Sequence, residues 1–189
     1  MTLPPDQAVV SLTVETYDGH SSSAAVGSNS DIYNRVASAI TALGVSRDDI
    51  SFSSYYVSYT APPNNRSGYT VDRTLSVKTN NLGLAGRIVD AATSAGATRI
   101  NGVTFGLADT TAAATQAMQR AVADATAKAT AIAAAAHLHI VGIASVNLGY
   151  SYVPQPLARM ATAVHGPTTF ETGNTTVSQT VNVVFLAKP

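Results

Sequence analysis

The feature that most constrains this chain is an alanine-rich run that ends near Ala136. Fourteen of the 27 residues from Thr110 to Ala136 are alanine, and neither glycine nor proline interrupts them. Alanine loses the least free energy on entering a helix, so the run predicts one long helix over about 110–136. Apolar residues recur there at spacings of three and four, which defines one helix face: Ala114, Ala117, Met118, Ala121, Val122, Ala125, Ala129, Ile132, Ala133 and Ala136. Because alanine lets a neighbouring element approach closely, we expect this face to lie flat against a sheet.

Alternating apolar residues predict strands on both sides of the long helix. Ala8, Val10, Leu12 and Val14 share one parity, which is typical of a half-buried strand. The strand predicted over Ile50–Thr60 changes phase midway, and a β-bulge near Ser53-Ser54 accounts for this change. Further strands are expected over 69–77, 100–107, 144–152 and 177–186. The last of these ends in VNVVFLA, which is apolar on both faces and predicts a strand covered on both sides.

Two shorter helices complete the predicted order. One begins between Ser21 and Ser30 and ends at Gly44, and the other ends at Gly96, since glycine favours helix C-termini. The order of elements predicts an α+β fold: a mixed, largely antiparallel sheet with helices packed on one face. We expect residues 1–189 to form a single domain with a projecting loop or hairpin arm at about 154–173, where three prolines and two glycines occur.

Composition narrows the classes of function. Eleven basic and eleven acidic residues give a net charge of zero, and no basic run occurs, which argues against nucleic-acid binding. The absence of cysteine excludes disulfides and thiol nucleophiles. No apolar run approaches the roughly 18–20 residues that span a bilayer. Met1 leads almost directly into a strand, so we expect that an upstream targeting segment has been removed.

His137 and His139 are the most plausible pair of metal ligands. In an extended segment, residues i and i+2 point to the same face, so two imidazoles could share one metal ion. The alternative is a helix exit at which His137 meets the negative end of the helix dipole. Two ligands without a third make a poor site, and we predict no metal and no cofactor. His20 and His165 lie in polar loops and could join the pair only through the fold.

Other candidates for catalysis have simpler explanations. Gly19-His20-Ser21-Ser22-Ser23 lacks the Gly-x-Ser-x-Gly elbow of serine hydrolases, so these hydroxyl groups are expected to cap the next helix. Asp48 and Asp49 are adjacent and diverge in direction, so they more plausibly form the turn before Ile50 than an acid–base pair. Gly83 and Gly86 have neither the lysine nor the spacing of a phosphate-binding loop.

Tyrosines provide the strongest sign of an interaction surface. The predicted hairpin carries Tyr55, Tyr56, Tyr59 and Tyr69, and Tyr150 and Tyr152 lead into the arm. Tyrosine offers a large apolar face with a polar tip, which suits partner contacts. The alternative is that half of these side chains, by alternation, pack in the core.

Several stretches, taken in order, resemble the SIMPL-domain family. They are Pro5–Ala8, Gly44–Ile50, Gly68-Tyr69, Gly96-Ala97 with Ile100, Val103-Thr104-Phe105, then Arg120-Ala121, Asp124-Ala125 and Lys128-Ala129, and finally Gly173 before the last strand. No single motif is specific, but the series runs nearly the whole length. Two features depart from the family pattern. His137 stands where a glycine is usual at the end of the long helix, and the usual leading segment before Pro5 is absent.

The resemblance implies an α+β fold, export to the cell envelope (periplasmic or secreted) and self-assembly in some members. It carries no agreed catalytic residues. The first hypothesis is therefore a non-catalytic envelope protein that acts through homo-oligomer formation or a protein partner. The second is a carrier of a small apolar ligand held between the sheet and the alanine-lined helix. The third is a hydrolase or metal enzyme that uses His137 and His139.

Overall fold

The computed structural model describes residues 2–62, 67–152, 159–160 and 168–189. The chain separates into two compact units. We call them the sheet unit (Pro5–Gly106 with Pro156–Gly173) and the hairpin unit (Met1–Pro4, Leu107–Gln155 and Asn174–Pro189). Both combine helices with antiparallel strands, which confirms the α+β class. The single domain expected over residues 1–189 stays a prediction.

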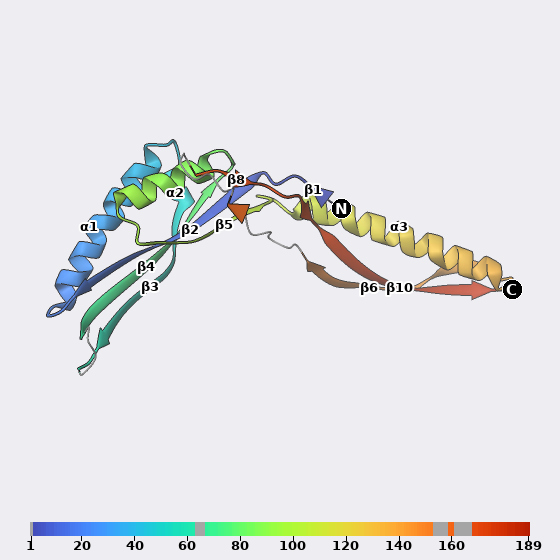
Figure 1. The fold of residues 1–189 in the computed structure, drawn as a ribbon. Coiled ribbons are helices and arrows are strands. Elements are labelled where there is room, and N and C mark those ends of the chain that lie inside the picture. Colours follow the sequence, from blue (N-terminus) through green and yellow to red (C-terminus); the bar gives the residue numbers. More distant parts are fainter. Residues whose placement is uncertain (1, 63–66, 153–158, 161–167) are drawn as a thin grey trace. The chain divides into compact units, whose positions relative to one another are not determined.

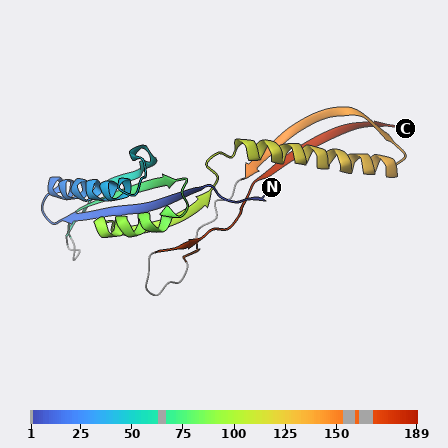
Figure 2. The same cartoon turned by 90° about the horizontal axis from the view of Figure 1, so that it is seen from above.

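The sheet unit is built on four antiparallel strands in the order β3-β4-β2-β5 (Figure 1). Its main elements are β2 (Gln7–Asp18), α1 (Ser22–Thr41), a 3-10 turn (Arg47–Asp49), β3 (Ile50–Thr60), β4 (Gly68–Thr79), α2 (Leu84–Ala95) and β5 (Arg99–Gly106). Helices α1 and α2 lie side by side over one face of the sheet (Figure 2). The short strands β7 (Arg159–Met160) and β8 (Phe170–Glu171) pair with each other in the same unit.

Central strand β2 supplies the middle of the core. Ala8, Val10, Leu12 and Val14 are completely buried, which confirms the predicted alternation. They pack in one cluster with side chains of β4, α1 and α2, including Leu75, Val77, Val36, Ile40, Ile88 and Ala92. Burying a side chain of this size stabilises a fold by about 1.5–3 kcal/mol, so this cluster is the main source of stability in the unit.

A buried amide fixes α1 over two particular strands. Asn29 of α1 is completely buried, and its Nδ2 donates to the backbone oxygen of Val14 in β2 at 2.9 Å and to that of Val71 in β4 at 3.2 Å. Helix α1 is therefore held above β2 and β4, and β3 lies one strand further out.

Strand β3 contains the predicted bulge. Its pairing with β4 shifts register between Phe52 and Ser54, so Ser53 is the additional residue. Phe52 and Tyr55 are three positions apart and would normally point to opposite faces. Because the bulge inserts one residue between them, they lie on the same face of the sheet.

The helix boundaries in the sheet unit follow the predicted capping residues. Ser21 caps α1, since its Oγ accepts from the Ala24 backbone N–H at 3.3 Å. Helix α1 ends at Thr41, and Gly44 follows with a φ of 92°, a conformation that glycine adopts without strain. Gly96 caps α2 in the left-handed conformation.

The hairpin unit consists of a long helix on a two-stranded sheet (Figure 1). Helix α3 (Thr111–Ala135) confirms the helix expected from the alanine run, and β6 (His139–Tyr152) pairs antiparallel with β10 (Ser178–Lys188). The short strands β1 (Thr2–Leu3) and β9 (Thr175–Thr176) also pair. An i,i+4 ion pair lies on this helix, with Lys128 Nζ at 2.6 Å from Asp124 Oδ2.

Most of the alanine face of α3 lies against β10 and β6. Ala113, Ala117 and Ala133 are buried, and the residues between them on this face are half-buried. The prediction was wrong for the end of the face, because Ile132 is 70% exposed and Ala136 is also exposed. An open hollow of about 230 Å³ lies beside Ile132 and Ala136 at this end of the helix.

The prediction that the last strand is covered on both sides was also wrong. Val184 and Leu186 of β10 are just over half exposed. They alternate with Val183 and Phe185, which are half-buried. Among the described strands this sheet contains β6 and β10, and α3 covers one of its faces, so described elements cover the apolar sequence VNVVFLA on one side.

Most of the arm expected at 154–173 lies outside the described residues. Its described parts are β7 and residues 168–173, which include β8. Thr168 is tied to α2, because its Oγ1 donates to Asp90 Oδ1 at 2.6 Å. Among the helices that the structure describes, none is both long and apolar enough to cross a bilayer.

Candidate functional site

Strand β3 is an uncovered edge of the four-stranded sheet. It pairs with β4 on one side, and no described strand pairs with its other side. Because α1 is held over β2 and β4, the large side chains of β3 on the helix side remain exposed. We call these four residues the β3 surface: Phe52, Tyr55, Val57 and Tyr59, which are between 43% and 57% exposed. A contiguous exposed apolar surface of this kind marks an interaction site more often than isolated apolar residues do.

Strand register places the β3 surface on the same side as the core. Tyr55 pairs with Arg73, and Arg73 pairs with Val14, a buried core residue. Directly paired residues share a face, so Tyr55 points to the helix side. Tyr56 pairs with Asp72, points to the opposite face and is 67% exposed.

The predicted interface tyrosines fall into three groups. Tyr55, Tyr56 and Tyr59 are exposed, so they do not pack in the core. Tyr69 is half-buried, and its ring centroid lies 4.9 Å from that of Tyr59. The side chains of Tyr150 and Tyr152 lie outside the described residues. An interface role for all six stays a prediction.

Two residues beside this surface were not predicted from the sequence, Tyr33 of α1 and Arg73 of β4. The Tyr33 ring lies 5.2 Å from that of Phe52, measured between centroids, so α1 and β3 meet there. A signal for Arg73 was present, because Arg73 has the same parity as Val71 and Leu75, which are buried. A cation in phase with core residues indicates an inward-facing charge.

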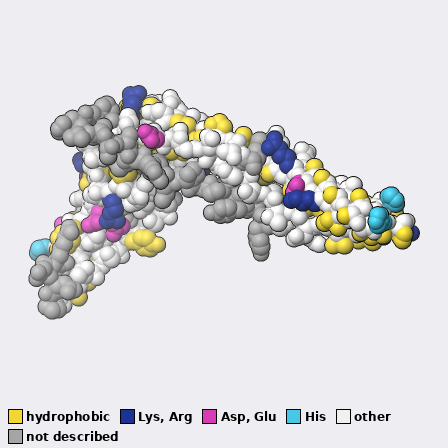
Figure 3. All heavy atoms as spheres, turned by 45° about the vertical axis from the view of Figure 1, so that its right-hand side comes forward, with side chains coloured by type: hydrophobic (Ala, Val, Ile, Leu, Met, Phe, Trp, Pro, Cys, Tyr) yellow, Lys and Arg dark blue, Asp and Glu magenta, His cyan; other side chains and the backbone are white. Residues whose placement is uncertain are grey.

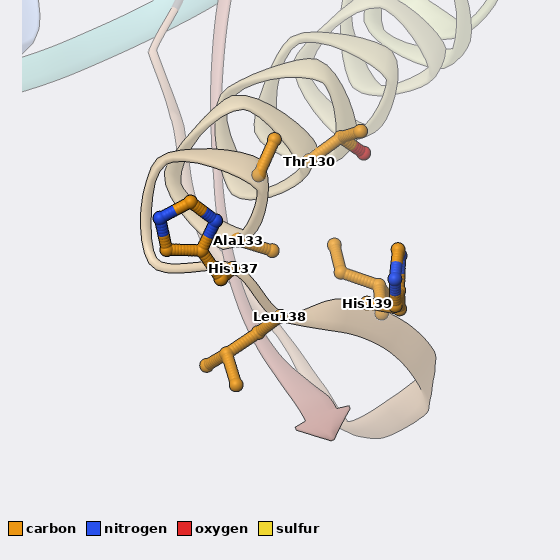
Figure 4. A pocket seen from close by; sticks show the side chains of 7 residues that line it. Thr130, Ala133, His137, Leu138 and His139 are labelled. Atoms are coloured by element: carbon orange, nitrogen blue, oxygen red, sulfur yellow. The ribbon is translucent and has the colours of Figure 1, made fainter. Parts of the chain in front are cut away.

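The two histidines lie at the end of α3 and the start of β6, and they line a pocket of about 350 Å³ (Figure 4). Their imidazole rings lie apart in the pocket and do not converge on a common point (Figure 4). Among the described residues, no group of three or more His, Cys, Asp or Glu side chains is placed to hold a metal ion. The pair could therefore supply at most two ligands from separate positions.

The candidate carboxylate and hydroxyl groups accept hydrogen bonds from backbone N–H groups. Asp18 Oδ1 accepts from the backbone N–H groups of His20 and Ser21 at 2.8 and 2.7 Å, and these two bonds hold the pKa of Asp18 below its usual value. Asp48 and Asp49 lie in the 3-10 turn before β3, as expected, and Ser46 caps this turn. Asp109 accepts from the Thr111 backbone N–H at 2.7 Å, and this bond lowers the pKa of Asp109. These carboxylates stabilise turns and helix starts.

The hairpin unit offers an apolar hollow. Hydrophobic side chains are visible along its surface (Figure 3). The hollow of about 230 Å³ between α3 and the hairpin is lined by Ala129, Ile132, Ala133, Ala136, Leu138, Ile140, Phe185 and Ala187. Typical ligand sites occupy about 300–1,000 Å³, so this hollow is small for a carrier of an apolar ligand.

Comparison with known proteins places the chain in a family. Residues 1–185 match the family model for SIMPL, described as "Protein of unknown function (DUF541)". The chain belongs to the SIMPL family. It is also similar to the "26 kDa periplasmic immunogenic protein" of Brucella melitensis biotype 1, with 27% identity over 205 residues, 100% of this chain and 81% of the relative. The Brucella abortus protein of the same name matches with the same identity and coverage.

His137 adopts a backbone conformation that is unusual for a residue other than glycine. Its φ is 57°, and among the described residues it is the one non-glycine residue with a positive φ. The Leu138 backbone N–H donates to the Ala133 oxygen at 2.8 Å, which closes the end of α3 around it. A glycine adopts this conformation at lower cost than a histidine does.

Proposed function

We propose that this SIMPL-family chain is a non-catalytic protein of the cell envelope that acts by binding protein. The partner is another copy of the chain or a second protein, and β3 is the contact. The observation that carries this proposal is the uncovered β3 surface, in which an apolar and aromatic strand lies at a free sheet edge. The periplasmic designation of the Brucella relatives supports the same compartment for this chain.

The chemistry of β3 supports pairing at its edge. No charged residue occurs from Ile50 to Thr60. Free edges in soluble proteins usually carry charges or prolines that prevent pairing with another strand. An edge without them, flanked by tyrosines, suits a specific contact in which backbone bonds supply affinity and side chains supply selectivity.

Light scattering across a dilution series tests self-assembly. We expect a mass above the 19.4 kDa of one chain at micromolar concentration, falling towards that value on dilution. Val57→Lys places a charge on the edge strand and should shift the equilibrium towards the monomer.

Val141→Lys is the matched control, because Val141 is similarly exposed but lies on β6 of the hairpin unit. It should leave the mass unchanged. A wild-type monomer at tens of micromolar would remove self-assembly from the proposal. Dissociation by Val141→Lys and not by Val57→Lys would move the contact to the hairpin unit.

A further inference from the structure

The part of β3 that follows the bulge is nearly the same when it is read backwards. The stretch from Ser54 to Thr60 has the sequence SYYVSYT. Val57 is at its centre, Tyr55 and Tyr59 lie two positions away on either side, and a hydroxyl residue stands at each end. An antiparallel contact between two copies of one strand pairs each residue with its counterpart across the centre. Such a contact brings identical surfaces together, and this stretch is therefore self-complementary.

The two tyrosines of this stretch are held in place within the chain. The guanidinium carbon of Arg73 lies 5.0 Å from the ring centroid of Tyr55 and 5.4 Å from that of Phe52. A cation at this distance attracts the electron-rich face of a ring. The ring centroid of Tyr59 lies 4.9 Å from that of Tyr69. Because these contacts already restrict the exposed rings, a partner that packs on them loses less side-chain entropy.

We propose that β3 pairs antiparallel with β3 of a second copy of the chain, in a register centred on Val57. Val57 then lies opposite Val57 of the second copy, and Tyr55 lies opposite Tyr59. Directly opposite residues have Cβ atoms about 4.5–5.5 Å apart, so each tyrosine packs against a tyrosine on the helix side. The two four-stranded sheets join into one. This inference rests on the proposed function and assigns its partner, a second copy.

A hollow beside the β3 surface fits the same register. It measures about 300 Å³ and is lined by Phe52, Tyr55 and Arg73. Tyr59 of the second copy lies opposite Tyr55, so its ring is next to this hollow. The two-fold symmetry of the pair places Tyr59 of the first copy beside the hollow of the second. Aromatic side chains that fill pockets near the centre of an interface supply much of its binding energy.

Disulfide cross-linking tests the register, because the chain has no cysteine of its own. Val57→Cys places two thiols directly opposite each other. Opposite residues of antiparallel strands have Cα atoms about 4.5–5.5 Å apart, within the range of a disulfide. We expect a covalent dimer on a non-reducing gel after mild oxidation. Tyr59→Cys alone should give no dimer, since its two thiols would be four residues, or about 14 Å, apart along the strands.

A mixture of two variants tests the register independently. Chains with Tyr55→Cys and chains with Tyr59→Cys should form a covalent dimer when they are mixed, and neither should do so alone. Val141→Cys is the matched control, because Val141 is similarly exposed but lies on β6, and it should remain monomeric. Hydrogen exchange of the unsubstituted chain needs no cysteine. The amides of residues 54–60 should be protected at high protein concentration and should lose this protection on dilution.

Three results would overturn the inference. A dimer from Tyr59→Cys alone would show another register, and a dimer from Val141→Cys but not from Val57→Cys would show another surface. Light scattering separates these failures from that of self-assembly. A mass above 19.4 kDa without cross-linking at Val57 would overturn the register and leave self-assembly in place. A wild-type monomer at tens of micromolar would overturn both, and would leave a second protein as the partner in the proposed function.

Discussion

The sheet unit and the hairpin unit place helices on one face of an antiparallel sheet, but they bury different side chains. The sheet unit buries Leu12, Leu75 and Ile40 completely beneath α1 and α2. The described part of the hairpin unit has a small cluster of buried apolar residues, formed by Ala113, Ala117 and Val177. Buried area sets most of the hydrophobic stabilisation, so the sheet unit carries most of the stability of the described chain.

Each unit also leaves one strand about half exposed on its helix side. In the sheet unit this strand is β3, with aromatic side chains around an arginine. In the hairpin unit it is β6, where Ile143, Val146 and Leu148 pair with residues of β10 that face α3 and yet remain about half exposed. The exposed side of β3 combines charge and ring stacking, which make binding selective for particular partners. The exposed side of β6 is aliphatic and contributes only apolar contact area.

Truncation of one leucine in each unit should give the largest difference. Leu12→Ala removes a completely buried side chain from the central strand and should lower the free energy of unfolding by about 2–5 kcal/mol. Leu148→Ala removes a side chain that is 62% exposed on β6 and should change it by less than about 0.5 kcal/mol. Urea unfolding of both variants measures the two values. Similar losses would mean that β6 is covered in solution, by a partner or by another copy.

Overpacking of α3 should have an intermediate effect. Ala117→Leu inserts a larger side chain where α3 is buried and should lower the free energy of unfolding by about 1–3 kcal/mol. Ala123→Leu, on the exposed face of the same helix, is the control and should be nearly neutral. Thermal unfolding monitored by circular dichroism compares them. If the two variants melted at the same temperature, the alanine face would not be a packed face.

Metal ions should have the smallest effect. Stoichiometric zinc or nickel should leave the melting temperature unchanged, since a metal that binds only the folded state must raise it. Differential scanning calorimetry with and without metal measures this directly. A rise of several degrees that His139→Ala removes would show that His137 and His139 form a site, and that the hairpin unit is stabilised by metal instead of by packing.

Local sequence signals predicted much of the fold, because each acts within a few residues. The phase change in β3 predicted its bulge, and Gly96 predicted the end of α2. Alternation in β2 predicted the four residues at the centre of the core. These features depend on backbone conformation and on the alternation of side chains, and both are determined by residues that are adjacent in the sequence.

The candidate site was less accessible from the sequence, because it depends on which strand a helix covers. Parity shows that Tyr55 and Val14 share a face, but it does not show that α1 touches β3 at Phe52 and still leaves the large side chains of that strand about half exposed. The rings around Arg73 come from two elements, α1 and β3, while Arg73 lies on a third, β4, and only the folded chain brings them together. For the same reason Ile132 matched the alanine face by spacing and is nevertheless exposed.

The bulge at Ser53 also limits the length of β3 that can pair with another strand at the free edge. An inserted residue bends the strand and increases its twist, so a second flat strand cannot follow the whole of Ile50–Thr60. The longest regular stretch of the edge is the part beyond Ser54. A strand that docks there would stop at the bulge. Bulges in edge strands are one of the ways in which native sheets resist edge-to-edge aggregation, so this bulge disfavours the stacking of long flat strands that produces fibrils.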